Sequence, residues 1–245
     1  MVPAESETVR AFVLAGGYGS RLSSRLGGQP KILAPFRGRP FLETQVEWLA
    51  AAGVDDVVLC LGVAADPVLA HLRSRPPSDV RVTAVREPEP LGTGGAVAFA
   101  AAGESQPFLV VNGDTLAAFS LDALWDCHAE RAAMVTLVCY RISDASAKGR
   151  VEIGDDGLVT AFREKSGGGG AWVSGGIYAC EPSLPARIPR GRRVSLETEV
   201  FPSLVAAGER VAAWHADGRL YDIGTPAGLD EAEEAWATDS PRSRP

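Results

Sequence analysis

Short apolar segments alternate with segments of helical periodicity along the first 142 residues. Continuous apolar runs, which are typical of strands buried on both faces, occur at residues 8–15, 56–61, 80–86, 108–111 and 134–142. Apolar residues recur at helical spacing in residues 41–53, 66–72, 94–102 and 121–131. Gly53 ends the first of these helices, and Ser120 is expected to cap the last. This order predicts an α/β fold with a mainly parallel sheet flanked by helices.

The pattern changes after Gly149. Two short strand-like segments, residues 151–153 and 158–163, flank the turn sequence Asp155-Asp156-Gly157, which predicts a hairpin. Another strand is expected at residues 172–179. The region is therefore predicted to be an antiparallel insertion.

The last quarter of the chain returns to alternating elements. Ser195 is expected to cap a helix through residue 205, strands follow at 211–215 and 220–223, and Thr225-Pro226 begins the last helix. We expect one domain over residues 1–238. The tail, residues 239–245, is rich in Ser, Pro and Arg and is predicted to be disordered.

Composition narrows the class of protein. The 245 residues are 46% hydrophobic, and the formal net charge of -7 argues against nucleic-acid or acidic-membrane binding. Four scattered cysteines without a CxxC pair are expected to be buried thiols rather than a zinc site. Because the first residues are acidic and no apolar stretch is long enough to span a bilayer, we expect a cytoplasmic protein.

A glycine-rich loop is the first candidate for chemistry. Residues 14–22 read Leu-Ala-Gly-Gly-Tyr-Gly-Ser-Arg-Leu, and Pro30-Lys31 follows. Between Glu7 and Glu43 there are six cations and no acid, so this segment is expected to attract anions within an acidic chain. Only Lys31, Lys148 and Lys165 are lysine, which makes them candidates for special roles. The loop fits neither the GxGxxG nor the GxxxxGK[ST] pattern, yet it predicts a phosphate cradle.

This loop resembles that of the sugar-phosphate nucleotidylyltransferases, in which Gly-Gly-x-Gly-x-Arg-Leu precedes Pro-Lys. The likeness continues through residues 87–96 (EPEPLGTGGA), 111–114 (VNGD), 162–165 (FREK) and 221–226 (YDIGTP). Within that family it is most similar to the heptose 1-phosphate guanylyltransferases, then to the mannose and glucose 1-phosphate enzymes. The resemblance implies a Rossmann-like, GT-A-like fold, with residues 8–142 as the nucleotide-binding core and 143–225 as mostly the sugar-phosphate-binding part.

The predicted strands also bring candidate residues together. The glycine loop, Glu87 and Asp114 each follow a parallel strand, so they should meet at the carboxyl ends of the sheet. Asp114 and Asp222 offer two hard oxygen ligands that suit Mg²⁺. The resemblance assigns both aspartates to that metal.

Further roles come from the resemblance alone. It implies that Arg21 holds the β- and γ-phosphates and that Lys31 lies near the α-phosphate, so that Arg21, Lys31 and Asp114 are the catalytic residues. The implied nucleotide contacts are Leu14, Ala15, Gly16, Gly17, Gly19, Ser20, Arg21, Glu87, Gly92 and Thr93. The implied sugar-phosphate contacts are Asn112, Lys148, Gly149, Glu164, Lys165, Ser174 and Gly175. Ser174 departs from the family pattern, which usually has asparagine there.

The implied activity joins a nucleoside triphosphate, with GTP favoured, to a heptose or hexose 1-phosphate and releases pyrophosphate. The enzyme is expected to be a monomer or homodimer that needs Mg²⁺ and no general base. His71, His128 and His215 are accordingly expected to be surface residues of helices or strands. The alternatives are a cyclitol phosphate or another acceptor, another nucleotide, or a non-catalytic nucleotide-sugar sensor.

Overall fold

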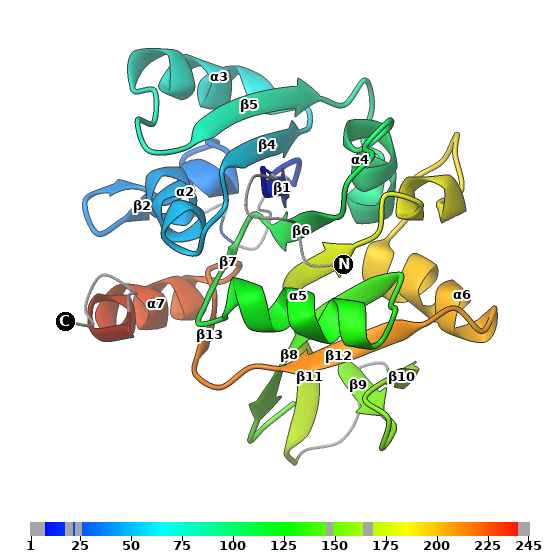
Figure 1. The fold of residues 1–245 in the computed structure, drawn as a ribbon. Helices are drawn as coiled ribbons and strands as arrows, with labels where there is room; N and C mark the ends of the chain where they lie inside the picture. The colour runs from blue at the N-terminus through cyan, green and yellow to red at the C-terminus, as the bar shows by residue number, and fades with distance from the viewer. Residues whose placement is uncertain (1–7, 18–21, 23–25, 146–148, 164–168, 240–245) are drawn as a thin grey trace.

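A seven-stranded sheet forms the centre of the molecule (Figure 1). The computed structural model describes residues 8–17, 22, 26–145, 149–163 and 169–239. The strand order is β12-β8-β11-β6-β1-β4-β5. These strands are β1 (Arg10–Leu14), β4 (Asp56–Leu61), β5 (Arg81–Arg86), β6 (Phe108–Asn112), β8 (Val135–Ile142), β11 (Ala171–Cys180) and β12 (Val211–His215). Because β11 alone runs antiparallel to its neighbours in this sheet, the prediction of a mainly parallel α/β fold is confirmed.

Helices cover both faces of the sheet. They are α2 (Phe41–Ala51), α3 (Ala65–Ser74), α4 (Gly92–Ala100), α5 (Leu121–Glu130), α6 (Phe201–Ala206) and α7 (Pro226–Asp239). Figure 1 shows α2 and α7 at the left of the sheet and α4 and α6 at the right. Neighbouring strand residues face opposite sides: Val13 packs in the core with α2 and α7, whereas Phe12 packs in the core with α4 and α6. Burial on both faces explains why the strands are continuously apolar.

The strand predicted at 172–179 forms, but it belongs to the central sheet. As β11 it lies between β6 and β8, and residues 175–180 are all buried. The separate antiparallel part is the hairpin of β9 (Arg150–Ile153) and β10 (Val159–Arg163). An apolar run shows that a strand is buried but does not show its direction, so the sequence placed β11 in the insertion.

Two small sheets complete the fold. Strands β2 (Pro35–Phe36) and β3 (Arg39–Pro40) pair with each other, and β7 (Thr115–Ala117) pairs with β13 (Leu220–Asp222). The sequence predicted β13 but not its partner, because β7 has only three residues. The β7–β13 pair sets Asp222 opposite Thr115, and the Ile223 amide donates to the Asp114 carbonyl at 2.9 Å. The two predicted metal ligands are thus brought to neighbouring backbone positions.

Several helix ends agree with the sequence and others differ. The Ser120 hydroxyl caps α5 by accepting from the Ala123 amide at 3.3 Å. Ser195 likewise caps a helical segment, which begins as a π-helical turn, η4 (Leu196–Val200), and continues as α6. Helix α4 begins at Gly92 rather than Gly94, and α7 extends to Asp239, where the tail was expected to start.

The cysteines are buried and unpaired, as expected. Burial raises the pKa of the Cys60 and Cys139 thiols to about 12. His128, by contrast, was wrongly expected at the surface: it is 4% exposed, with its ring between Thr136 and Glu181. Burial lowers the pKa of His128, although Glu181 acts in the opposite direction. Among the described residues, no helix is long and apolar enough to cross a membrane.

Candidate functional site

The first candidate cavity, here called the glycine-loop pocket, opens beyond the carboxyl ends of β1 and β6 and encloses about 410 Å³. Its lining residues are Leu14, Ala15, Gly16, Gly17, Lys31, Ile32, Glu87, Pro90, Gly92, Thr93, Ala96, Asn112, Gly113, Asp114 and Arg193. The structure therefore brings together the described part of the glycine loop, Glu87 and Asp114, as the strand order predicted.

A lysine and a carboxylate face each other in this pocket. Lys31 lies on the short 3₁₀ helix η2 (Lys31–Leu33), and its ammonium group forms an ion pair with Asp114, which follows β6. Their side chains are only 19% and 18% exposed, respectively. A partly buried cation beside a carboxylate can stabilise phosphate oxygens and also hold the carboxylate in place.

Glu87 connects the glycine loop with the turn before α4. Its Oε2 accepts from the Leu91 amide at 3.0 Å, and its Oε1 lies close to the loop, where a Cβ added to Gly16 would be 3.1 Å away. Burial raises the pKa of Glu87, and the Leu91 hydrogen bond partly offsets this. The close approach at Gly16 leaves little room for a side chain, so a glycine suits this position.

A second cavity, the hairpin pocket, lies between β11, the β9–β10 hairpin and η4, and encloses about 490 Å³. Its lining residues are Asn112, Leu137, Gly149, Arg150, Val151, Phe162, Arg163, Ser174, Gly176, Tyr178, Glu197, Thr198, Phe201, Pro202 and Asp222. Asn112 lines both cavities, so the two pockets adjoin at the end of β6.

Some of the predicted sugar-phosphate residues line this pocket and others do not. Asn112, Gly149 and Ser174 line it, whereas Gly176 lines it in place of the predicted Gly175. Gly175 instead packs against the Tyr140 ring, 2.5 Å from where its Cβ would be. The remaining predicted residues, Gly19, Ser20, Arg21, Lys148, Glu164 and Lys165, lie outside the described residues.

Asp114 and Asp222 are the candidate metal ligands. Asp114 lines the glycine-loop pocket, Asp222 lines the hairpin pocket, and the β7–β13 pairing joins their backbones. Asp222 Oδ1 accepts from the Gly224 amide at 2.8 Å, which orients this carboxylate. The described residues contain no group of three or more His, Cys, Asp and Glu side chains suited to a metal. Two carboxylates still fit Mg²⁺, since this ion commonly uses one or two together with phosphate oxygens and water.

Four of the six cations of the expected cluster are among the described residues, namely Arg10, Lys31, Arg37 and Arg39. Arg10 pairs with Asp56 and Glu104, and Arg39 pairs with Glu47, so neither faces the glycine-loop pocket. Among the described cations of residues 8–42, Lys31 lines the pocket. Two of the described arginines are therefore paired with acids, and the expectation for Arg21 and Arg25 lies outside the described residues.

Sequence reasoning missed four charged residues that line the two pockets: Arg150 and Arg163 of the β9–β10 hairpin, Arg193 and Glu197. The segment before η4 runs beside the start of α4: the Gly94 amide donates to the Val194 carbonyl at 2.9 Å, and the Val194 amide to the Leu91 carbonyl at 2.8 Å. This contact brings Arg193 to the glycine-loop pocket, while Glu197 lines the hairpin pocket. The cationic sequence 190–193 (RGRR) in an acidic chain was the signal that could have found Arg193.

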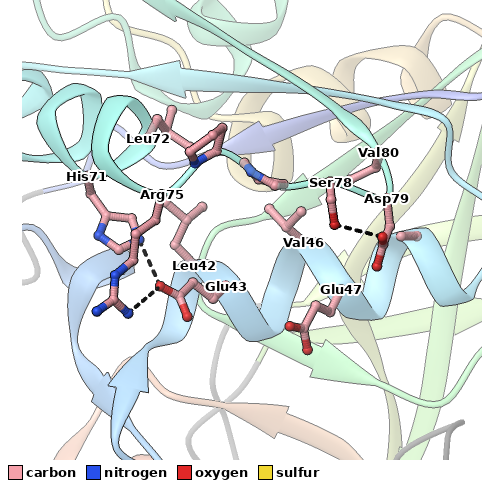
Figure 2. Close-up of a pocket in the computed structure, with 13 residues that line it drawn as sticks. Leu42, Glu43, Val46, Glu47, His71, Leu72, Arg75, Ser78, Asp79 and Val80 are labelled. Carbon is pink, nitrogen blue, oxygen red and sulfur yellow. Dashed lines mark hydrogen bonds and ion pairs between the residues drawn. The ribbon is translucent and has the colours of Figure 1, made fainter.

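A third cavity, the α2–α3 pocket, encloses about 250 Å³ between α2, α3 and the start of β5 (Figure 2). At one end His71 and Arg75 approach Glu43 Oε1 at 3.0 and 3.8 Å, and at the other Ser78 donates to Asp79 at 2.8 Å (Figure 2). Among the described residues, those that line this pocket include none predicted for the site.

Comparison with known proteins identifies the family of this chain. A family model described as "Nucleotidyl transferase" matches residues 10–239. The chain belongs to the nucleotidyl transferase family. The mannose-1-phosphate guanylyltransferase of Mycobacterium tuberculosis is 36% identical over 223 residues, and mannose-1-phosphate guanylyltransferase 1 of Arabidopsis thaliana is 32% identical over 225. Each alignment covers 89% of this chain but only 62% of the relative, so the chain spans under two thirds of these relatives.

Solved structures of other proteins share the fold. HddC from Yersinia pseudotuberculosis superposes with a TM-score of 0.83 at 27% identity, covering 94% of this chain and 100% of HddC. HddC has also been solved in complex with GMP-PN with the same similarity to this chain. A UTP-bound UGPase from Acinetobacter baumannii has a TM-score of 0.77 at 18% identity, over 96% of this chain and 95% of the UGPase, which shows the shared fold alone.

Proposed function

We propose that this chain transfers a nucleoside monophosphate from a nucleoside triphosphate to a sugar 1-phosphate, forming a nucleotide sugar and pyrophosphate. The observation that carries the proposal is the adjoining of two polar pockets at Asn112, with the Lys31–Asp114 pair in one and Asp222 in the other. A reaction between two phosphorylated substrates needs two binding sites that meet where phosphate charge collects.

The glycine-loop pocket is the proposed nucleotide site. Its glycine backbone and Lys31 suit a triphosphate, and Arg193 adds a forked donor. Thr93 and Glu87 line this pocket near the start of α4 and are the proposed contacts to the base. GTP is the favoured nucleotide, which is supported by the names of the curated relatives and by the GMP-PN complex of HddC.

The hairpin pocket is the proposed acceptor site. It combines hydroxyl, amide and carboxylate groups, which suit the hydroxyls of a sugar. Mannose 1-phosphate and heptose 1-phosphate are the leading candidates, the first from the names of the curated relatives and the second from the sequence resemblance.

The proposed mechanism is a direct in-line displacement. An oxygen of the sugar phosphate attacks the α-phosphorus of the triphosphate, the bond to the β-phosphate oxygen breaks, and pyrophosphate leaves with the electron pair. Because the attacking phosphate is already anionic near neutral pH, the chain needs no general base. No histidine is among the described lining residues of either pocket.

Lys31 and Asp114 would orient the reacting phosphates within a partly enclosed site. Mg²⁺, held by Asp114 and Asp222, would neutralise phosphate charge when bound.

A substrate matrix tests the proposal. The four ribonucleoside triphosphates and dTTP are each combined with mannose, glucose and heptose 1-phosphates of both anomers and Mg²⁺, and pyrophosphate release is measured. We expect the fastest release with GTP and a mannose or heptose 1-phosphate. A purified, folded chain that binds nucleotide but releases no pyrophosphate with any pair would instead be a nucleotide-sugar sensor, which contradicts the proposal.

A further inference from the structure

The carboxylate of Glu197 accepts hydrogen bonds from one lining residue of each pocket. Its Oε1 accepts from the Tyr178 hydroxyl at 3.1 Å, and Tyr178 lines the hairpin pocket. Its Oε2 accepts from the Thr93 hydroxyl at 3.1 Å, and Thr93 lines the glycine-loop pocket. Ser195 adds a hydrogen bond to Oε2 at 3.3 Å. One side chain therefore holds a residue of each proposed substrate site.

In the hairpin pocket, the direction of each hydrogen bond in this network is fixed. A carboxylate has no hydrogen, so each hydroxyl bonded to Glu197 must donate. The Tyr178 hydroxyl therefore gives its one hydrogen to Glu197 and accepts from Ser174 Oγ, 3.2 Å away. Ser174 Oγ in turn accepts from the Gly176 amide at 3.2 Å. Since its hydrogen is already used, Ser174 can offer a ligand only a lone pair.

The nucleotide side is fixed in the same way. Thr93 donates its hydrogen to Glu197 and accepts from the Leu196 amide at 2.8 Å. Tyr178 is fully buried, and this burial, together with Glu197, raises the pKa of its hydroxyl well above the usual value. Tyr178 therefore stays protonated, so that it donates to Glu197 and accepts from Ser174.

The side-chain carbonyl of Asn112 is a second hydrogen-bond acceptor beside this network. Asn112 lines both pockets, and its Nδ2 is directed at Gly176, 2.6 Å from where a Cβ at that glycine would be. Its Oδ1 is buried and has no hydrogen-bond partner among the described residues. A buried carbonyl without a donor is costly, so a rotation of the Asn112 amide that let Oδ1 accept from a ligand hydroxyl would be favoured.

We propose that Glu197 is a positioning residue that ties Thr93 to the Ser174–Tyr178 pair, so that the Ser174 side of the hairpin pocket presents oxygen lone pairs and selects a sugar with free hydroxyl groups. Arg150 and Arg163 line the same pocket as hydrogen-bond donors. This inference rests on the proposed function and deepens it. It predicts discrimination against acceptors in which the recognised hydroxyl is deoxygenated or methylated, because these lack the hydrogen that the Ser174 side of the pocket requires. It also predicts that the two substrate sites depend on the same carboxylate.

The main test is Glu197→Gln, which keeps the shape but replaces one accepting oxygen by an NH₂ group. This side chain cannot accept from both Tyr178 and Thr93. Steady-state kinetics would use GTP and the sugar 1-phosphate that the wild type converts fastest, together with its monodeoxy and mono-O-methyl analogues. We expect KM to rise for both substrates by about tenfold or more, as for loss of a hydrogen bond to a charged group. Preference for the parent sugar over the analogue changed at the recognised hydroxyl should fall as well.

Glu209→Gln is the matched control, because Glu209 pairs with Arg187 at 2.6 Å and lines neither pocket. It should leave both KM values unchanged. Tyr178→Phe should raise KM mainly for the sugar phosphate, and Thr93→Val mainly for GTP. In the Glu197→Gln background each of these changes should have little further effect, because the shared partner is already lost.

The outcomes separate the two proposals. If the wild type releases no pyrophosphate with any pair, the proposed function fails and this inference fails with it. If the wild type is active but Glu197→Gln leaves both KM values and the analogue preference unchanged, only this inference is overturned. The same conclusion follows if Tyr178→Phe and Thr93→Val act independently of Glu197. If Glu197→Gln does not fold, the double variant Tyr178→Phe/Thr93→Val decides instead, because effects on the two KM values that simply add would overturn the coupling through Glu197.

Discussion

The glycine-loop pocket and the α2–α3 pocket are both cavities with charged side chains, yet they are built differently. The first lies at the carboxyl ends of parallel strands and is lined by glycine backbone, Lys31 and Asp114. The second lies in the seam between two helices, where Leu42, Val46 and Leu72 form an apolar lining. A seam between packed helices is a common result of imperfect side-chain packing, whereas strand ends gather loops that can bind a ligand.

The charges of the two cavities also differ in their partners. In the α2–α3 pocket, His71 and Arg75 lie beside Glu43 on one rim, at 3.0 and 3.8 Å (Figure 2). In the glycine-loop pocket the Lys31–Asp114 pair is joined by Glu87 and Arg193 from separate segments of the chain. Because the charged groups of both cavities come from separate segments, the position of a cavity at the carboxyl ends of parallel strands is the better guide to the proposed reaction site.

The largest effect is expected from Asp114→Asn. The change removes a negative charge beside Lys31 and from the proposed metal site while preserving the shape of the side chain. Turnover should fall by about 10³-fold or more, with a far-UV circular dichroism spectrum like that of the wild type. Asp79→Asn in the α2–α3 pocket is the control and should keep near-normal turnover. Equal losses in both variants would remove the distinction between the two cavities.

Lys31→Met is expected to have the next largest effect. It removes the cation that faces Asp114 in a partly buried site, so turnover should fall by about 10²-fold. Lys31→Arg should restore little, because the planar guanidinium does not fit the position of a compact ammonium group. Arg75→Met, on the rim of the α2–α3 pocket, provides the comparison and should be active. Pyrophosphate release measured at saturating substrates would show whether the lysine acts in the chemical step.

The sequence predicted the residues of the glycine-loop pocket that follow parallel strands. The glycine loop, Glu87 and Asp114 could be placed together because buried strands are apolar on both faces and their carboxyl ends share one edge of the sheet. Arg193 could not be placed in this way, since it reaches the pocket only through backbone contacts between Val194 and the start of α4.

The position of β11 and the register of β13 could not be predicted from the sequence either. Strand direction and pairing depend on which segments meet in the folded chain, and periodicity does not record this. The same holds for Glu197, whose hydrogen bonds join Thr93 and Tyr178 from distant parts of the chain. Expected roles of Arg21 and Lys165 concern positions outside the described residues and stay predictions.

Gly92→Ala should have a smaller effect that combines stability and binding. Gly92 has φ of 73°, and a Cβ there would lie 2.5 Å from the Val194 carbonyl oxygen. The backbone cannot adapt without moving the segment that carries Arg193, so KM for the nucleotide should rise. Gly103→Ala is a matched control, because Gly103 has φ of 90° with nothing within 4 Å of its added Cβ.

Both glycine variants should lose roughly 1 kcal/mol of unfolding free energy through the positive φ. Gly92→Ala should lose roughly 1–3 kcal/mol more through the steric contact. Urea denaturation of the two variants would isolate that difference. A Gly92→Ala protein as stable as Gly103→Ala, with unchanged nucleotide KM, would contradict the argument that close packing of Gly92 against Val194 holds Arg193 at the glycine-loop pocket.

The smallest effect is expected from His71→Gln in the α2–α3 pocket. His71 lies 3.0 Å from Glu43 and is 15% exposed, and Gln can place an amide near the same carboxylate. The unfolding free energy should change by less than about 1 kcal/mol, and turnover should stay within about twofold of the wild type. Kinetics with the best substrate pair and urea denaturation would measure both quantities. A large loss of turnover in a variant of unchanged stability would mean that the α2–α3 pocket acts on the reaction, and the contrast between the two cavities would then fail.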